Sequence, residues 1–149
     1  MTFAFGTWTR CSFLLLAGSL TGCAGLETSK LAYNDSVKVG EPIKTEGCYD
    51  AAILLGRDLD QSKEIAKKVL AAVDSSISED SAEQIKAQRN RHIGVIVGSG
   101  GEEITITLKT VAPGRTYVAV ATKTGFVGAA GQKAWSCQIV DEIAKMVSH

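Results

Sequence analysis

The segment from residue 103 to residue 122 constrains the fold more than any other part of this 149-residue chain. Residues 104–109 read Ile-Thr-Ile-Thr-Leu-Lys, an alternation typical of a strand with one buried face and one wet face. Ala-Pro-Gly-Arg at 112–115 is typical of a turn, because proline and glycine favour turn geometry. Residues 116–122 are again rich in strand-forming residues. We therefore expect two antiparallel strands joined by a tight turn.

A third strand is expected just before this pair. Residues 93–97 are rich in β-branched side chains, and Gly98-Ser99-Gly100-Gly101 separates them from residue 103 as a second turn. These glycines do not predict a phosphate loop, since no Gly-Lys-Ser/Thr follows and a strand rather than a helix comes next. The three strands together predict a half-buried antiparallel meander.

Two amphipathic segments predict the helices. Residues 61–74 place apolar side chains on one face at about 100° per residue, and Asp58 is positioned to cap the start of that helix. A closing helix is expected from about residue 130 to residue 147. The apolar stripes of the two helices would contain Ile65, Ala66, Val69, Leu70, Ala72 and Val73, and then Trp135, Ile139, Ile143, Met146 and Val147.

Two segments have no single interpretation. Residues 51–55 form a short apolar run that we interpret as a buried strand, although the first turns of a helix fit as well. Residues 79–91 combine helix-favouring polar residues with an alternation around Ile85 and Ala87 that is typical of an edge strand. The expected fold class is α+β, a two-layer sandwich in which an antiparallel β-meander is covered by two helices.

The first 23 residues are typical of a secretory signal peptide. Arg10 is the only charged residue before Glu27, and a short apolar run follows it before the small residues Thr21 and Gly22. The run is about half the roughly 20 residues that a membrane-spanning helix needs. A signal peptide with an unrelated Cys23, or a buried N-terminal helix, is the alternative.

Leu20-Thr21-Gly22-Cys23 resembles the lipobox of bacterial lipoproteins. The resemblance implies that Cys23 carries a diacylglycerol thioether, that cleavage occurs just before Cys23, and that its new amino group is acylated. Two or more acyl chains give durable membrane anchoring. Ala24 stands where, in enterobacterial lipoproteins, an aspartate favours the inner membrane, so the resemblance implies an outer-membrane anchor facing the periplasm.

This resemblance divides the chain into three parts. Residues 1–22 are the expected signal peptide, residues 23–47 the lipidated cysteine and a flexible tether, and residues 48–149 a single α+β periplasmic domain. The tether is expected because the segment is rich in glycine and mixed charge and has no sustained apolar period, although residues 37–39 fit a short edge strand. A flexible chain of that length spans on the order of 25 to 30 Å, which predicts the distance between domain and membrane.

The four cysteines point to the same compartment. Cys11 leaves with the signal peptide and Cys23 is lipidated, so Cys48 and Cys137 remain as an even pair in an oxidising environment. We predict a disulfide between them, with two free thiols as the alternative. Isolated cysteines lack the close pairing of structural zinc sites, so we expect no metal.

Charge and composition exclude several function classes. Sixteen Lys and Arg balance sixteen Asp and Glu, which gives no electrostatic basis for binding nucleic acid. Neither His92 nor His149 has a motif-spaced catalytic partner, and no cofactor motif is present. The pairs Asp58/Asp60 and Glu102/Glu103 are typical of caps and loop surfaces, and Trp135 of a core.

The glycine-rich segment before the last helix is a candidate anion-binding loop. It lies between a predicted strand and a predicted helix, where backbone amides can surround an anion. The alternative is a tight crossing of small residues that brings the last helix close to the sheet. The residues of the candidate loop are Gly125, Gly128, Gly131 and Lys123, with Lys133 on its other flank.

The region from about residue 51 to residue 147 is similar to small bacterial lipoproteins of a domain-of-unknown-function type, through residues 116–128 and the closing helix. That similarity implies no activity. We therefore expect a non-catalytic envelope interaction or structural module, with the membrane and an unidentified envelope protein as partners. The alternative is a small-ligand or lipid-binding domain, and an enzyme comes third. A deep apolar pocket would favour a ligand, and a flat apolar patch would favour a protein.

Overall fold

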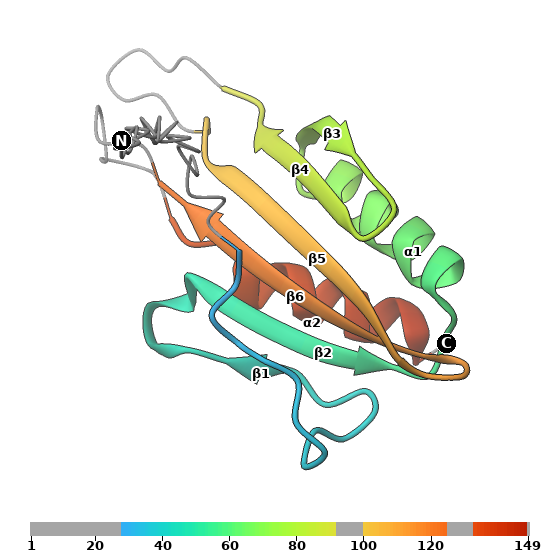
Figure 1. Ribbon diagram of the computed structural model, residues 1–149. Helices are drawn as coiled ribbons and strands as arrows, with labels where there is room; N and C mark the ends of the chain where they lie inside the picture. The colour runs from blue at the N-terminus through green and yellow to red at the C-terminus, as the bar shows by residue number, and fades with distance from the viewer. Residues whose placement is uncertain (1–27, 92–99, 125–132, 149) are drawn as a thin grey trace, which may run out of the picture.

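The computed structural model describes residues 28–91, 100–124 and 133–148. These residues form one six-stranded sheet and two α-helices. Every pairing between the strands is antiparallel, and the strand order is β1-β2-β6-β5-β4-β3. The expected α+β class is confirmed (Figure 1). The elements in chain order are β1 (Ile43–Lys44), a short 3-10 turn (Glu46–Cys48), β2 (Asp50–Leu55), α1 (Leu59–Ala72), β3 (Ser75–Asp80), β4 (Gln84–Arg89), β5 (Glu103–Ala112), β6 (Arg115–Lys123) and α2 (Ser136–Val147).

The β5–β6 hairpin is the centre of the sheet and confirms the strongest sequence prediction. Leu108 pairs with Val118 and Thr110 pairs with Thr116, and the connection turns through Gly114 at a φ of +66°. A positive φ suits glycine because it has no Cβ to clash with the backbone. Residues 51–55 lie in β2, so the strand interpretation of that run is also confirmed. The strand expected at 93–97 lies outside the described residues.

One buried cluster joins the helices to a single face of the sheet, which we call the helix face (Figure 1). Alternate residues of β2, β4, β5 and β6 point into it, because successive side chains of a strand point to opposite faces. Its buried members are Ala51, Ile53, Leu55, Ala66, Val69, Leu70, Val73, Ile85, Ala87, Ile104, Ile106, Leu108, Val118, Val120, Cys137, Ile139, Val140 and Ile143.

Helix α1 begins where the sequence predicted. The Asp58 carboxylate accepts a hydrogen bond from the Gln61 amide at 2.8 Å, which satisfies one free amide of the first turn. The buried face of the helix differs from the predicted stripe in two ways: Ala72, predicted in the stripe, is exposed, and the polar Ser62, outside it, is fully buried. Ser62 points into the protein and Ala72 points to solvent, so the buried face of α1 is rotated toward Ser62 relative to the prediction.

Helix α2 is shorter than the sequence predicted. It begins at Ser136, and residues 133–135 are not helical. The reason is that two amides in this stretch bond to the sheet instead: Lys133 donates to the Glu102 carboxylate and Trp135 donates to Thr122 Oγ1. Met146, predicted in the apolar stripe, is 42% exposed.

Residues 79–91 contain a strand, so the helical alternative is wrong. Strand β4 pairs with β5 on one side and with β3 on the other. Strand β3 was not predicted, because its sequence Ser-Ser-Ile-Ser-Glu-Asp is polar and mostly exposed. It is attached to α1 by Asp80, which pairs with Lys63 at 2.6 Å and with Lys67 at 2.8 Å. Hydrogen bonds from these ammonium groups hold the pKa of Asp80 below its usual value.

The segment predicted as a flexible tether instead lies across the other face of the sheet. We call residues 30–39 the strap, and the face it covers the strap face (Figure 1). The Lys30 amide donates to Asp50 Oδ1 at 3.1 Å, and the Tyr33 ring meets the Tyr117 ring edge-on at 5.5 Å. Strap residues Leu31, Tyr33 and Val37 pack against buried Ala52, Leu54, Tyr117 and Ala119.

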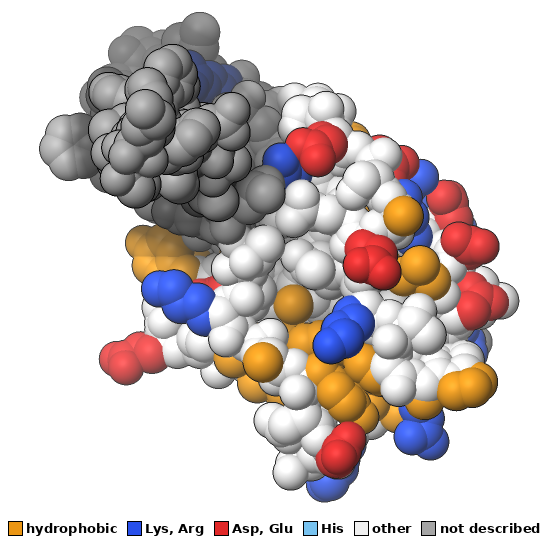
Figure 2. Space-filling model, viewed as in Figure 1, with side chains coloured by type: hydrophobic (Ala, Val, Ile, Leu, Met, Phe, Trp, Pro, Cys, Tyr) orange, Lys and Arg blue, Asp and Glu red, His pale blue; other side chains and the backbone are white. Residues whose placement is uncertain are grey.

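After the strap the chain joins the sheet edge. The Gly40 amide donates to the Leu54 carbonyl at 2.8 Å, and Val39 forms an isolated parallel bridge with Leu54 before β1 pairs with β2. The tether prediction is therefore wrong for residues 30–44. Figure 2 looks onto this face and shows hydrophobic side chains gathered in its lower half, with charged groups around the margin.

Candidate functional site

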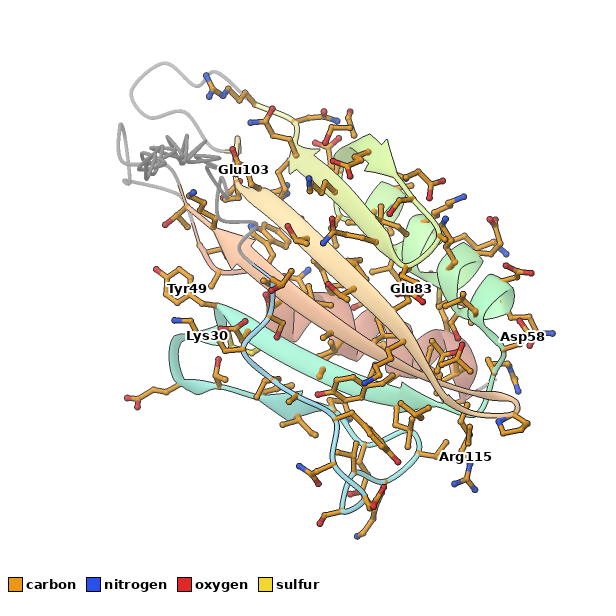
Figure 3. All side chains as sticks on the ribbon, viewed as in Figure 1. Lys30, Tyr49, Asp58, Glu83, Glu103 and Arg115 are labelled. Carbon is orange, nitrogen blue, oxygen red and sulfur yellow. A yellow bond between two sulfur atoms is a disulfide. The ribbon has the colours of Figure 1, made fainter. Side chains whose placement is uncertain are left out.

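The predicted site residues that the structure describes, Cys48, Lys123 and Cys137, lie at one end of the sheet. We call it the loop end: β2 and β5 begin there, β4 and β6 end there, and α2 starts beside them. Figure 3 places Tyr49, Lys30 and Glu103 at this end, and Asp58 and Arg115 at the opposite one. The opposite end, where β5 turns into β6, is called the turn end.

The predicted disulfide between Cys48 and Cys137 is present at the loop end. It joins the turn before β2 to the first turn of α2, with the two Cα atoms 5.2 Å apart and the cysteines separated by 89 positions in sequence. Cys48 has a φ of +60° and follows Gly47 at +75°, so the chain makes a sharp left-handed turn there. On the chain-entropy model a loop of this length contributes about 4 to 5 kcal/mol as an upper bound.

The backbone next to this disulfide is held by a buried hydroxyl network. The Tyr49 carbonyl accepts one bond from the Thr122 amide and one from Ser136 Oγ, both at 2.8 Å. Ser136 Oγ also lies 2.8 Å from Thr122 Oγ1, and both side chains are buried. Tyr49 itself is 50% exposed. The network therefore fixes the backbone at Tyr49 while the aromatic ring projects into solvent.

Glu102 is fully buried, which corrects the expectation that Glu102 and Glu103 form a surface pair. Its Oε1 accepts from the Trp135 indole at 3.4 Å and from the Lys133 amide at 3.3 Å. Its Oε2 is buried and has no hydrogen-bond partner among the described residues. No signal in the sequence distinguished Glu102 from Glu103, because the two identical residues stand side by side between a glycine pair and the strand.

Two cations lie against the ring of Trp135. The Arg89 guanidinium carbon is 3.8 Å from the ring centroid, and the Lys133 ammonium nitrogen is 4.0 Å from it. Such contacts are attractive because the ring face is negative. Arg89 Nε also donates to the Val73 carbonyl at 2.8 Å. Trp135 is thus half-buried and held between charged groups, rather than a plain core residue.

The candidate anion loop is only partly visible. Lys123 ends β6 opposite Glu103 and is exposed, whereas Gly125, Gly128 and Gly131 lie outside the described residues. Cys23, the predicted lipidation residue, and both histidines lie outside them too. Within the described ranges, no group of three or more His, Cys, Asp or Glu side chains is placed to hold a metal ion.

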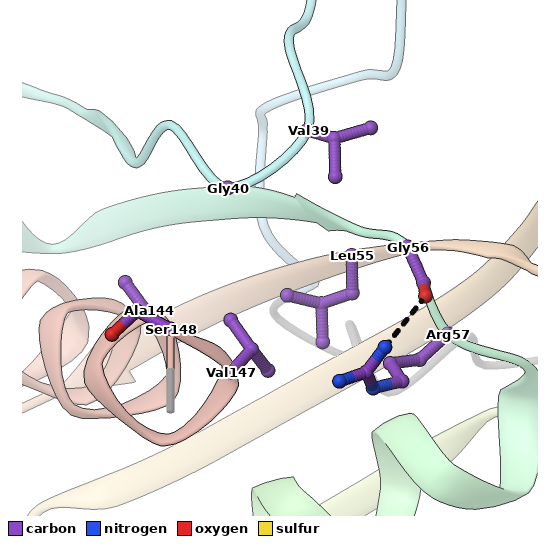
Figure 4. A pocket seen from close by; sticks show the side chains of 8 residues that line it. All are labelled: Val39, Gly40, Leu55, Gly56, Arg57, Ala144, Val147 and Ser148. Atoms are coloured by element: carbon purple, nitrogen blue, oxygen red, sulfur yellow. Dashed lines mark hydrogen bonds between the residues drawn. The ribbon is translucent and has the colours of Figure 1, made fainter.

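A small apolar niche lies at the turn end (Figure 4). It encloses about 230 Å³ between the end of β2, the end of α2 and the strap. Leu55 and Val147 point into the same space, with Val39 above and Arg57 at the side. Arg57 Nη1 donates to the Gly56 carbonyl at 3.3 Å. Typical ligand pockets measure about 300 to 1,000 Å³, so the niche is below that range.

A second hollow of about 280 Å³ lies over β3, β4 and β5. Polar side chains dominate its lining, with Ser78, Lys86, Gln88, Glu103 and Thr105 among them. It is therefore not the deep apolar pocket that would favour a lipid ligand.

The chain matches no protein-family model and no curated protein sequence. Among the helices of the described residues, none has both the length and the apolarity needed to cross a membrane.

Proposed function

We propose that this protein is a lipoprotein of the bacterial outer membrane that works as a non-catalytic interaction or structural module in the periplasm. Its folded part would be a two-layer α+β sandwich held to the membrane through acyl chains on Cys23. Its partner would be another envelope protein.

The disulfide is the observation that best supports this proposal. Cysteine pairs of this kind persist in oxidising compartments such as the periplasm and are rare in the cytosol. A cysteine directly after a signal-like segment and a bonded pair in the domain beyond it both fit a secreted, anchored protein. The two features are independent, since one depends on residues 20–23 and the other on the geometry of the loop end.

The buried polar groups of the loop end support a structural rather than a chemical role. The Ser136 hydroxyl and the Thr122 amide hold the Tyr49 carbonyl, the Thr122 hydroxyl bonds to Ser136, and Glu102 holds the chain entering α2. These side chains therefore fix backbone geometry, which a rigid binding module needs.

The anchor is tested by labelling cells with a radioactive fatty acid. Wild-type protein should incorporate label and fractionate with the outer membrane, while Cys23→Ala should be unlabelled and should keep its signal peptide. Cys11→Ala is the matched control, because Cys11 lies within the segment to be removed. A Cys23→Ala protein that is still labelled and processed would refute the proposal. Chemical cross-linking of the labelled protein in intact cells then identifies its envelope partner.

A small-ligand function is the second candidate, and the turn-end niche is the observation that favours it. Its walls are apolar, and the Arg57 guanidinium at its side suits a short apolar molecule with an anionic group. Titrating the protein with medium-chain fatty acids while recording methyl NMR signals of Leu55 and Val147 tests this. Shifts at these two residues that are lost in Arg57→Gln would support it.

A further inference from the structure

The strap leaves little chain between the proposed anchor and the folded domain. Lys30 follows Cys23 by only seven residues, and its amide is already bonded to Asp50 at the start of β2. Seven extended residues reach at most about 25 Å. The nine residues of β6 span about 30 Å from loop end to turn end. The loop end is therefore the part of the domain nearest the acyl chains.

An exposed aromatic side chain lies at that end. Among the described residues, Tyr49 is the most exposed large hydrophobic side chain at 50%. Three other large hydrophobic side chains are exposed among the described residues. Val39 and Met146 belong to the turn end, and Ile77 lies on edge strand β3. Tyrosine favours the membrane–water interface because its ring is apolar and its hydroxyl is polar.

The position of Tyr49 is rigid, which makes its exposure informative. Its carbonyl is bonded to Thr122 and Ser136, and the neighbouring Cys48 is linked to Cys137. A ring on such a fixed backbone loses little conformational freedom when it inserts into an interface.

The charges around Tyr49 are mixed. Exposed Lys30 lies beside it (Figure 3). Lys123, which pairs with Glu103, and Lys133, whose amide bonds to Glu102, belong to the same end. Glu46 precedes it by three residues, and Glu103 lies opposite Lys123. Because these acids, together with Asp50 next to Tyr49, offset the lysines, the aromatic ring should carry most of the contact and anionic lipid should strengthen it moderately.

We propose that Tyr49, with Lys30 beside it, forms a membrane-contact edge that seats the loop end on the headgroup region of the leaflet holding the protein's own lipid anchor. The inference rests on the proposed lipidation of Cys23. It fixes which end of the domain faces the membrane and leaves the turn end, with its apolar niche, pointing toward the periplasm.

Photo-cross-linking of the lipidated, full-length mature protein tests this contact. A benzoylphenylalanine is introduced in place of Tyr49 and, as the matched control, in place of exposed Arg115 at the turn end. Each protein is purified from membranes, reconstituted into vesicles of phosphatidylethanolamine and phosphatidylglycerol, and irradiated, and adducts are identified by mass spectrometry. We expect phospholipid adducts at position 49 and none at position 115. Adding Lys30→Glu should lower the yield at position 49 in these vesicles and leave it unchanged in phosphatidylcholine vesicles.

Two results would overturn the inference while leaving the anchor intact. One is a lipidated protein that gives no phospholipid adduct at position 49, and the other is an equal yield at positions 49 and 115. Mass spectrometry of the same samples reports the acyl chains on Cys23. If they are absent, the proposed function fails, and the contact edge fails with it.

Discussion

The two faces of the sheet are covered in different ways. On the helix face, residues from four strands and both helices interlock in one buried cluster. On the strap face, Ala52, Leu54, Tyr117 and Ala119 are buried by an extended segment that contributes Leu31, Tyr33 and Val37. The helix face therefore supplies most of the apolar burial that stabilises the fold. The strap face adds less burial, but it determines where the chain leaves the domain toward its N-terminus.

Breaking the disulfide should give the largest effect, because it joins the chain leaving the strap face to α2 on the helix face. Reduction, or the double variant Cys48→Ser/Cys137→Ser, should lower the free energy of unfolding by about 3 kcal/mol, below the chain-entropy bound because the unfolded chain retains structure. The helix-face cluster should still fold. Urea unfolding followed by Trp135 fluorescence measures this. Full alkylation of both thiols in native, unreduced protein would contradict the bond itself.

Truncating a side chain on the helix face should give the next largest loss of unfolding free energy. Ile106 is fully buried, so Ile106→Ala should cost about 2 to 3 kcal/mol from lost burial and the cavity left behind. Thr105→Ala on the same strand is the control and should cost less than about 1 kcal/mol, because that side chain is half-buried and points to the other face. If the two variants lose equal stability, the comparison of the faces is wrong.

A truncation in the strap should have a smaller and more local effect. Tyr33→Ala removes the ring contact with Tyr117 and part of the cover over the strap-face cluster, which should cost about 1 to 2 kcal/mol. Hydrogen exchange should accelerate at the bonded amides of the strap, such as Lys30, before it changes in β5 and β6. Lys38→Ala, an exposed strap residue, is the control. Equal acceleration throughout the sheet would mean that the strap unfolds only together with the core.

Alkaline pH should weaken the strap face selectively. Burial raises the pKa of the Tyr117 phenol, whose hydroxyl donates to the Leu31 carbonyl at 3.3 Å. A raised folded-state pKa means that the stabilising contribution is full below the unfolded value near 10 and is lost as the pH rises through the folded value. Stability should therefore fall above about pH 10, and Tyr117→Phe should flatten this fall. Thermal unfolding measured in small pH steps tests the slope, and a Tyr117→Phe curve parallel to wild type would contradict it.

The parts of the fold that the sequence predicted are those with regular periods. The apolar residues of helix α1 and of strands β5 and β6 recur with the period of the element. The Asp58 cap likewise depends on local geometry alone. The disulfide was predictable because two cysteines remained once the others had been assigned. β3 was missed because an exposed edge strand needs no apolar alternation.

The missed parts of the candidate site depend on tertiary contacts. The strap has no repeat, since Leu31, Tyr33 and Val37 are spaced to fit the particular surface they cover. Burial of Glu102 depends on Trp135, which is distant in sequence, so nothing local distinguishes it from Glu103. The late start of α2 also depends on tertiary contacts. The Lys133 and Trp135 amides donate to the side chains of Glu102 and Thr122, so they are not part of a helical turn.

The edge of the sheet formed by β3 affects association between molecules once the protein is held on a surface. A strand edge offers unpaired backbone groups to a neighbouring copy, and anchored molecules are crowded into a thin layer where such neighbours are frequent. The register shift between Ile77 and Glu79 interrupts the regular pairing of β3, and the salt bridge from Lys86 to Glu79 places charge beside the interruption. β3 is thereby a poor template for edge-to-edge aggregation, which under the proposed lipidation of Cys23 would favour a dispersed population of single molecules on the membrane.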